Sequence, residues 1–195
     1  MKGIYLLPLA ALLAQCRSVP DEGTDGTTTV PGRSGELQQI INVSAYDPKE
    51  RQREGNSFSQ HDVSALAANG SRGLIARAGK GGKLDQKCAD FVASADKAGM
   101  LPGLYYRVQK HVSPVTQANQ FVDRAEALAR GRRWNAPAML LSGDYDGDLP
   151  LSSILAFMDR VEQRTGVVPI AYLENSQALK EQTSRADRQT KARIG

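Results

Sequence analysis

Short apolar runs alternate with longer amphipathic segments between residues 37 and 173, and this alternation constrains the fold more than any other feature of the chain. Each run is short and is bounded by glycine, proline or polar turn formers, which is typical of a buried strand. The expected strands cover residues 37–43, 73–78, 101–108, 138–141 and 167–173. The intervening segments carry apolar residues at helical spacing and predict helices over residues 59–69, 85–98, 114–129 and 150–165.

Strands that alternate with helices in this way favour parallel βα units joined by right-handed crossovers. A closed eight-unit barrel needs about 250 residues, which is more than this chain of 195 residues offers. The expected fold class is therefore α/β, either an open doubly wound sheet or an incomplete TIM-like (β/α) barrel of about five βα units that lacks the closing strands. The polar end, residues 175–195, predicts a fraying helix. An open sheet edge would favour self-association.

The first 15 residues have the layout of a secretory signal peptide. A lysine precedes an apolar run from Ile4 to Ala14, and this run is too short for a stable membrane span. The following Leu13-Ala14-Gln15-Cys16 is similar to a lipoprotein cleavage box, which would attach lipid at Cys16. Gln15 stands where Gly, Ala or Ser is usual, so plain cleavage remains an alternative. We expect an exported protein, anchored to the membrane at Cys16 and facing the periplasm or cell surface, or otherwise secreted.

Composition divides the remainder of the chain into two parts. Residues 16–35 are rich in Pro, Gly, Thr and Ser and predict a flexible tether, whereas residues 36–195 are long enough for one globular domain. Cys88 lies on the apolar side of an expected helix, so we interpret it as a small buried hydrophobe. The formal net charge of +4 comes from dispersed basic residues, which suits an anionic cell wall and does not require a nucleic acid as partner.

Asp144 and Asp146 follow the fourth expected strand. Functional loops of parallel α/β folds gather at the carboxyl ends of the strands. Residues two apart in an extended segment point to the same side, so both carboxylates should project together while Tyr145 turns away. Neighbouring carboxylates can divide into a protonated acid and an ionised partner, which is what glycoside hydrolysis needs. Because glycines flank the pair, a solvated acidic turn remains the alternative.

Other ligand motifs fail at named positions. A calcium loop of the EF-hand type would need glycine at Leu149 and glutamate at Leu155. A phosphate-binding loop at residues 79–83 would need glycine at Arg77 and serine or threonine at Leu84. The two histidines are far apart and no Cys/His cluster has zinc-ligand spacing. We therefore expect no metal and no cofactor.

Taken in chain order, five segments resemble the family 25 lysozymes (muramidases). Residues 40–44 are similar to the family's opening Gly-Ile-Asp-Val-Ser, residues 74–79 to its second strand and loop, and residues 95–106 to its A-x-x-A-G-L-x-x-G-x-Y-H segment. Residues 144–146 stand where the family has Asp-x-Glu, and residues 161–172 are similar to E-x-x-T-G-x-x-P-x-I-Y. The resemblance implies an irregular barrel of five βα units closed by further strands.

The resemblance also implies a function, the hydrolysis of peptidoglycan glycan strands, with roles assigned by position. Asp146 would be the acid that protonates the glycosidic oxygen and Asp144 its carboxylate neighbour, while Asn42 takes the position of the first-strand aspartate and Tyr105 that of a sugar-contacting tyrosine. Asn42 is not a carboxylate, and Asp146 is one methylene shorter than glutamate. A misplacement of about 1 Å can cost on the order of a hundredfold in rate, so we expect weak or absent hydrolysis.

A second reading comes from another functional class. The chain would be a non-catalytic peptidoglycan-binding lipoprotein, a pseudo-enzyme that keeps the groove and uses aromatic side chains as sugar-stacking surfaces. The candidates are Tyr105, Tyr106, Tyr172 and Trp134. A third reading is a fragment of a longer enzyme.

Overall fold

The computed structural model describes residues 27–31, 37–44, 60–132 and 134–194. The expected signal peptide and Cys16 lie outside these residues. Part of the expected tether is a strand, β1 (Thr27–Pro31), which pairs antiparallel with β2 (Leu37–Val43). Three threonines and a valine make β1 compatible with a sheet edge. None of the described helices is long and apolar enough to cross a membrane.

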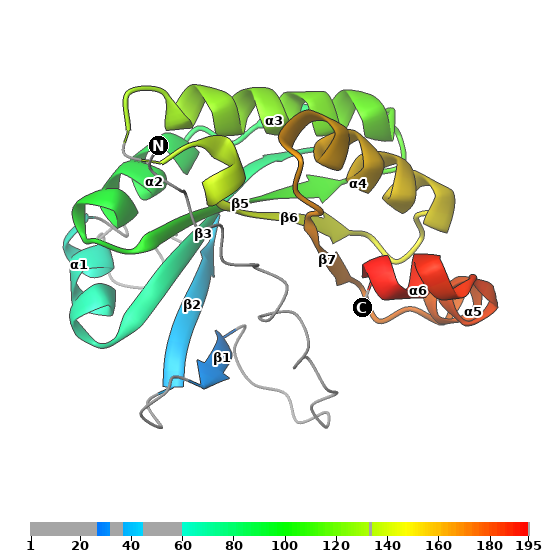
Figure 1. Ribbon diagram of the computed structural model, residues 1–195, viewed down its shortest axis with the longest axis horizontal. Coiled ribbons are helices and arrows are strands. Elements are labelled where there is room, and N and C mark those ends of the chain that lie inside the picture. The colour runs from blue at the N-terminus through cyan, green and yellow to red at the C-terminus, as the bar shows by residue number, and fades with distance from the viewer. Residues whose placement is uncertain (1–26, 32–36, 45–59, 133, 195) are drawn as a thin grey trace, which may run out of the picture.

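The sheet consists mainly of parallel strands arranged in the order of the chain. β2 is followed by β3 (Ser71–Lys80), β5 (Leu101–Val108), β6 (Leu140–Tyr145) and β7 (Ile170–Leu173), each parallel to the one before. The short β4 (Lys83–Leu84) pairs antiparallel with β3. A doubly wound sheet would reverse its strand order at a switch point, and this sheet does not. The prediction of an incomplete barrel is confirmed: β1 and β7 form the two edges of a curved sheet (Figure 1).

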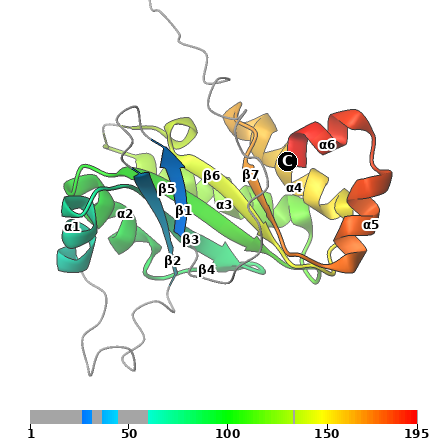
Figure 2. The ribbon, with the colours of Figure 1, turned by 90° about the horizontal axis from the view of Figure 1, so that it is seen from below.

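The helices between the strands cover one face of this sheet. They are α1 (Gln60–Ala68), α2 (Cys88–Lys97), α3 (Pro114–Ala129) and α4 (Leu151–Thr165). Figure 2 shows the molecule from below relative to Figure 1, and in this view the strands lie in front of α2 and α3. Since parallel barrels bury side chains on both faces of their strands, this half-barrel leaves its inner face without a helical cover among the described residues.

The core lies between the sheet and the helices. Alternate strand residues point into it, among them Leu74, Leu104, Tyr106, Leu141 and Tyr145, all nearly or fully buried. Four rings form its centre, with centroids 5.8–6.1 Å apart, and they are Tyr106, Tyr145, Phe121 and Phe157. Because side chains alternate along a strand, Tyr105, Arg107 and Asp144 must point to the opposite, inner face.

Several element bounds differ from the sequence-based expectation: the fifth strand begins at Ile170 rather than Val167, and the fourth continues to Tyr145 rather than ending at Leu141. The fourth strand begins at Leu140 rather than Ala138, because Asn135 caps a single 3₁₀ turn, η3 (Ala136–Ala138), through a 3.1 Å bond to the Ala138 amide. The polar end forms two helices, α5 (Gln177–Arg185) and α6 (Arg188–Ile194), in place of one fraying helix. Ser176 caps α5, and Arg193 of α6 forms ion pairs with Asp159 and Glu162 of α4.

Candidate active site

Asp144 and Asp146 lie at the carboxyl end of β6, on the inner face of the sheet. Tyr145 between them is fully buried in the core, packed edge-on against Phe157 at 5.8 Å. The two carboxylates therefore point away from the helices, and both contact one guanidinium, that of Arg107. The expected geometry, with both carboxylates on one side and Tyr145 on the other, is present.

Arg107 reaches the carboxylates because β5 pairs with β6 in a register that sets it beside Asp144. Its Nη1 lies 3.2 Å from Asp144 Oδ2, and its Nη2 lies 2.6 Å from Asp146 Oδ1. One planar fork thus holds two carboxylates, an arrangement that fixes the orientation of all three groups.

Burial and neighbouring charges shift the pKa values of Asp144 and Arg107. Burial raises the pKa of Asp144 above its ordinary value, the negative charges of Asp146 and Glu174 add to the rise, and Arg107 opposes it. Burial alone would lower the pKa of Arg107, but the two aspartates outweigh that effect and raise it. Asp144 thus has a weaker tendency to ionise than a solvated aspartate, while Arg107 stays charged.

A buried glutamine of α3 fixes the loop that follows β5. The fully buried Gln117 donates from Nε2 to the carbonyls of Gln109 and Val112, both at 2.8 Å, and its Oε1 accepts from the Gln109 amide at 3.0 Å. The Gln109 side chain in turn lies 3.5 Å from Asp146 Oδ2. The loop therefore presents Gln109 to Asp146 from a position held by the core.

The loop after Asp146 is fastened to the end of β7. The Gly147 amide donates to Glu174 Oε2 at 2.6 Å, and Ser176 Oγ donates to the Gly147 carbonyl at 2.7 Å. A Cβ at Gly147 would lie 2.7 Å from the Cβ of Ser176, which is too close. A side chain at this position would therefore require Ser176 to move. Together with the contacts of Arg107, these bonds connect the ends of β5, β6 and β7.

Two of the predicted sugar-contacting residues share the inner face with the carboxylates. Tyr105 is in register with Ser142 of β6, two residues before Asp144. Tyr172 of β7 is in register with Asp144 itself. Both tyrosines are half-buried. They stand on either side of β6, on β5 and β7, which suits a ligand that lies across the strand ends.

Asn42 is not brought together with the carboxylates. It is an exposed residue of β2, three strands away from β6. In the sheet, Asn42 pairs with Ile75 of β3, and Ile75 pairs with Gly103 of β5. Gly103 in turn pairs with Leu140 of β6, which lies four residues before Asp144. The two positions are therefore three strands apart and offset by four residues along β6.

Two aromatic predictions need correction. Tyr106 is fully buried in the core, where its hydroxyl donates to Gln120 at 3.0 Å and accepts from the Gly82 amide at 2.9 Å, so its ring cannot stack on a sugar. Trp134 precedes β6 and lies at the opposite end of the sheet from Asp146. Its indole N–H donates to Asp96 at 3.1 Å, and its ring packs on Arg132.

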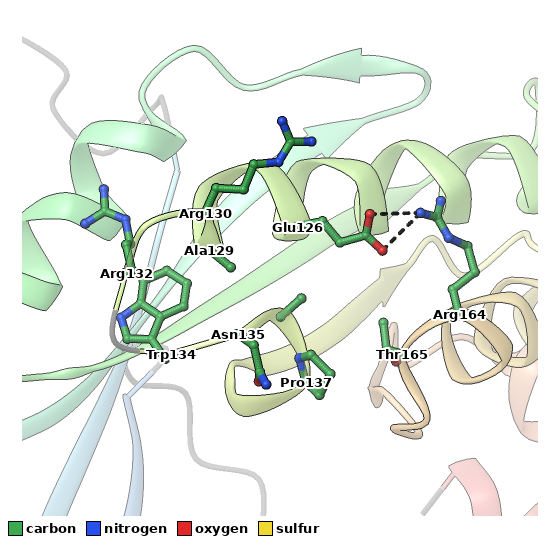
Figure 3. A pocket seen from close by; sticks show the side chains of 10 residues that line it. Glu126, Ala129, Arg130, Arg132, Trp134, Asn135, Pro137, Arg164 and Thr165 are labelled. Carbon is green, nitrogen blue, oxygen red and sulfur yellow. Dashed lines mark hydrogen bonds and ion pairs between the residues drawn. The ribbon is translucent and has the colours of Figure 1, made fainter.

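Trp134 borders an open groove of about 580 Å³ at the amino ends of β6 and β7, shown in Figure 3. Of its lining residues Glu126 is the acidic one, and Arg164 binds both of its oxygens at 3.1 Å. This groove offers no pair of carboxylates, so it does not suit acid–base hydrolysis. Nowhere in the described ranges do three or more His, Cys, Asp or Glu side chains group in a way that could hold a metal ion.

Comparison with solved structures identifies the type of fold. The catalytic domain of the endolysin ply40 from Listeria phage P40 aligns with a TM-score of 0.59 at 19% identity, over 76% of this chain and 68% of that one. A muramidase from Trichobolus zukalii aligns with a TM-score of 0.50 at 22% identity, over 67% and 62% of the two chains. A family 25 glycosyl hydrolase from Bacillus anthracis aligns with a TM-score of 0.52 at 16% identity, over 77% of this chain and 66% of that one.

The class that these neighbours define is the muramidase-type α/β barrel. The fold resemblance to family 25 lysozymes expected from the sequence is confirmed at the level of structure. The chain spans about two thirds of the length of these proteins. No protein-family model matches the sequence, and no curated protein matches it either.

Sequence reasoning missed Arg107, Gln109 and Glu174. A signal for Arg107 was present, because it lies two residues after Tyr105 in the same strand and must share its face. The contacts of Gln109 and Glu174 depend on how the loops after β5 and β7 fold over β6, which strand periodicity does not predict.

Proposed function

We propose that this chain is a peptidoglycan glycan-strand hydrolase of the lysozyme (N-acetylmuramidase) type, with weak activity. The observation that carries the proposal is the position of Asp144 and Asp146, side by side at the carboxyl end of β6, on the inner face of a muramidase-type sheet. Catalytic groups of parallel barrels are found at this end of the strands.

In the proposed reaction one water molecule is consumed. Asp146 donates a proton to the glycosidic oxygen as the bond between that oxygen and the anomeric carbon breaks. Asp144 must be ionised to stabilise the positive charge that develops on the sugar, and because its pKa is raised, this form requires a less acidic pH than it would for a solvated aspartate. Water then adds its oxygen to the anomeric carbon and returns a proton to Asp146. The aspartate is shorter than the glutamate of the family pattern, which is the physical reason for weak turnover.

Substrate binding is proposed for the inner face. Tyr105 and Tyr172 flank β6 and offer ring surfaces for pyranose stacking, while Asn42 would donate to or accept from a sugar hydroxyl further along a bound glycan. A polymer suits this arrangement better than a single sugar, because Asn42 and the carboxylates are three strands apart.

The experiment is the release of reducing ends from purified peptidoglycan by the wild type, Asp146→Asn and Asp146→Glu. We expect a low rate for the wild type, none for Asp146→Asn, and an increase of about tenfold for Asp146→Glu, since the added methylene restores the reach. Strong activity that is indifferent to both changes would refute the assignment of Asp146.

The second candidate is a non-catalytic wall-binding protein that uses the same face. A specific observation favours it: the Arg107 guanidinium contacts both carboxylates, and an acid can donate its proton only when that contact opens. Co-sedimentation with insoluble peptidoglycan distinguishes the two, because a binder sediments without releasing reducing ends.

Export and anchoring complete the proposal, and the support for them is the Leu13-Ala14-Gln15-Cys16 box. When the full chain is expressed in a bacterium, we expect it to partition into the detergent phase through a lipid on Cys16, and Cys16→Ser should release it. Equal partitioning of both forms would leave plain secretion.

A further inference from the structure

We propose that Arg107 is the positioning residue that decides between hydrolysis and mere binding at this site, because its guanidinium occupies the space between the two carboxylates where a glycosidic bond would have to lie. This inference rests on the proposed function of Asp144 and Asp146. It concerns a residue of β5, one strand away from the pair, and it gives a physical reason for weak turnover that is separate from the short side chain of Asp146.

The contacts of Arg107 define its role. Nη1 and Nη2 are 3.2 Å and 2.6 Å from oxygens of two different carboxylates. Its third nitrogen, Nε, is buried and has no hydrogen-bond partner among the described residues. Among the described residues, the ion pairs of the side-chain tip are those with Asp144 and Asp146, so whatever separates the guanidinium from them frees both carboxylates together.

The chemistry of hydrolysis conflicts with this arrangement. Two carboxyl groups that cleave a glycosidic bond must flank that bond, one of them protonated and the other ionised. A guanidinium that contacts both carboxylates fills the space between them, and it opposes the raised pKa of Asp144. Substrate can react only after it displaces the Arg107 guanidinium from the two aspartates. The displaced guanidinium can then pair with Glu174, with which it already interacts electrostatically.

The direct test compares Arg107→Met with Arg107→Lys. Methionine keeps an unbranched stem of similar length and removes the charge, whereas lysine keeps the charge and loses the fork. We expect Arg107→Met to release reducing ends from purified peptidoglycan about a hundredfold faster than the wild type, the lower end of what a positioned general acid contributes. Arg107→Lys, which keeps the positive charge, should release reducing ends more slowly than Arg107→Met.

Arg164→Met is the matched control. Arg164 also connects two carboxylates, at 2.6 Å to Asp123 and 3.1 Å to Glu126, but on the helical side of the molecule. We expect it to leave the rate unchanged. The gain in Arg107→Met should disappear when Asp146→Asn is added, since the acid is then absent.

The pH profile separates positioning from a structural role. Arg107 opposes the raised pKa of Asp144, so its removal should raise that pKa further. Activity requires ionised Asp144. On the acidic side of the pH profile, the activity of Arg107→Met should therefore appear at higher pH than that of Arg107→Lys. A merely structural effect would change the rate without shifting the pH profile.

The outcomes are distinct. If Arg107→Met folds and sediments with peptidoglycan but releases no more reducing ends than the wild type, the role of Arg107 is refuted while binding at the site stands. If neither Asp146→Glu nor Arg107→Met hydrolyses or binds peptidoglycan, the proposed function fails and the inference falls with it. Should Arg107→Met lose its circular dichroism signal, Arg107→Gln, which keeps polar contacts without charge, provides the same comparison.

Discussion

At the scale of the residue, the site is governed by how side chains alternate along strands. Asp144 and Asp146 point to the same face of the sheet because they are two residues apart. Neighbours in a strand point to opposite faces, so only one of Tyr105 and Tyr106 can belong to the site. The sequence alone does not say which of the two is buried. Contacts across strands, such as that of Arg107 with both aspartates, depend on the pairing register and stay beyond sequence reasoning.

Asp144 makes folding stability depend on pH. Its pKa is raised above the ordinary value of 3.8, chiefly by burial, so between that value and the raised one the folded chain binds a proton that the unfolded chain releases. The contribution of Asp144 to the free energy of unfolding therefore falls as pH rises through this window. Chemical denaturation of the wild type and Asp144→Asn at a series of pH values upward from 3.8 should show the wild type losing stability relative to the variant; a relative gain contradicts the assignment.

Gly147 is required by a close approach rather than by a special backbone angle. Gly147→Ala brings a methyl group to 2.7 Å from the Cβ of Ser176, and we expect a loss of about 1–3 kcal/mol in unfolding free energy from overpacking. In a Ser176→Gly background, which removes the opposing atoms, the same change should cost less. Equal costs in both backgrounds, measured by urea denaturation, would show that the collision does not matter.

At the scale of the element, the alternation of strands and helices was enough to predict the fold order. Some of the bounds that differ are set by specific side-chain contacts: Asn135 caps the turn before β6, and the Ser176 cap together with the ion pairs of Arg193 orders α5 and α6. Such contacts leave no periodic signal, so the sequence predicts one fraying helix at the polar end, whereas the structure has two helices that Arg193 ties to α4.

Two buried tyrosines allow a matched test of how the elements are joined. The Tyr106 hydroxyl connects the turn at Gly82 to Gln120 of α3, whereas the Tyr145 hydroxyl is buried without a hydrogen-bond partner among the described residues. Tyr106→Phe should lower the unfolding free energy by about 1–2 kcal/mol, while Tyr145→Phe should be neutral or stabilising. Thermal or urea melts check both; a larger loss for Tyr145→Phe would contradict the hydrogen-bonding pattern.

At the scale of the whole molecule, the described sheet is a half-barrel with β7 at one edge. Ile170 of β7 is 39% exposed, and an apolar strand edge favours association with a second copy. We expect dimers in sedimentation equilibrium that Ile170→Lys weakens. Leu84→Lys is the control, since Leu84 is 51% exposed but lies on β4, away from this edge. A monomer at all concentrations, or equal effects of both changes, would refute an interface at β7.

The central claim is that a glycan strand binds on the inner face, with its scissile bond at the carboxyl end of β6. The most direct test is a crystal structure of the Asp146→Asn protein with a peptidoglycan fragment of several sugars. We expect sugar rings across the ends of β5, β6 and β7, against Tyr105 and Tyr172, with a glycosidic oxygen beside residue 146. A fragment bound instead in the groove beside Trp134, with the inner face empty, would contradict it.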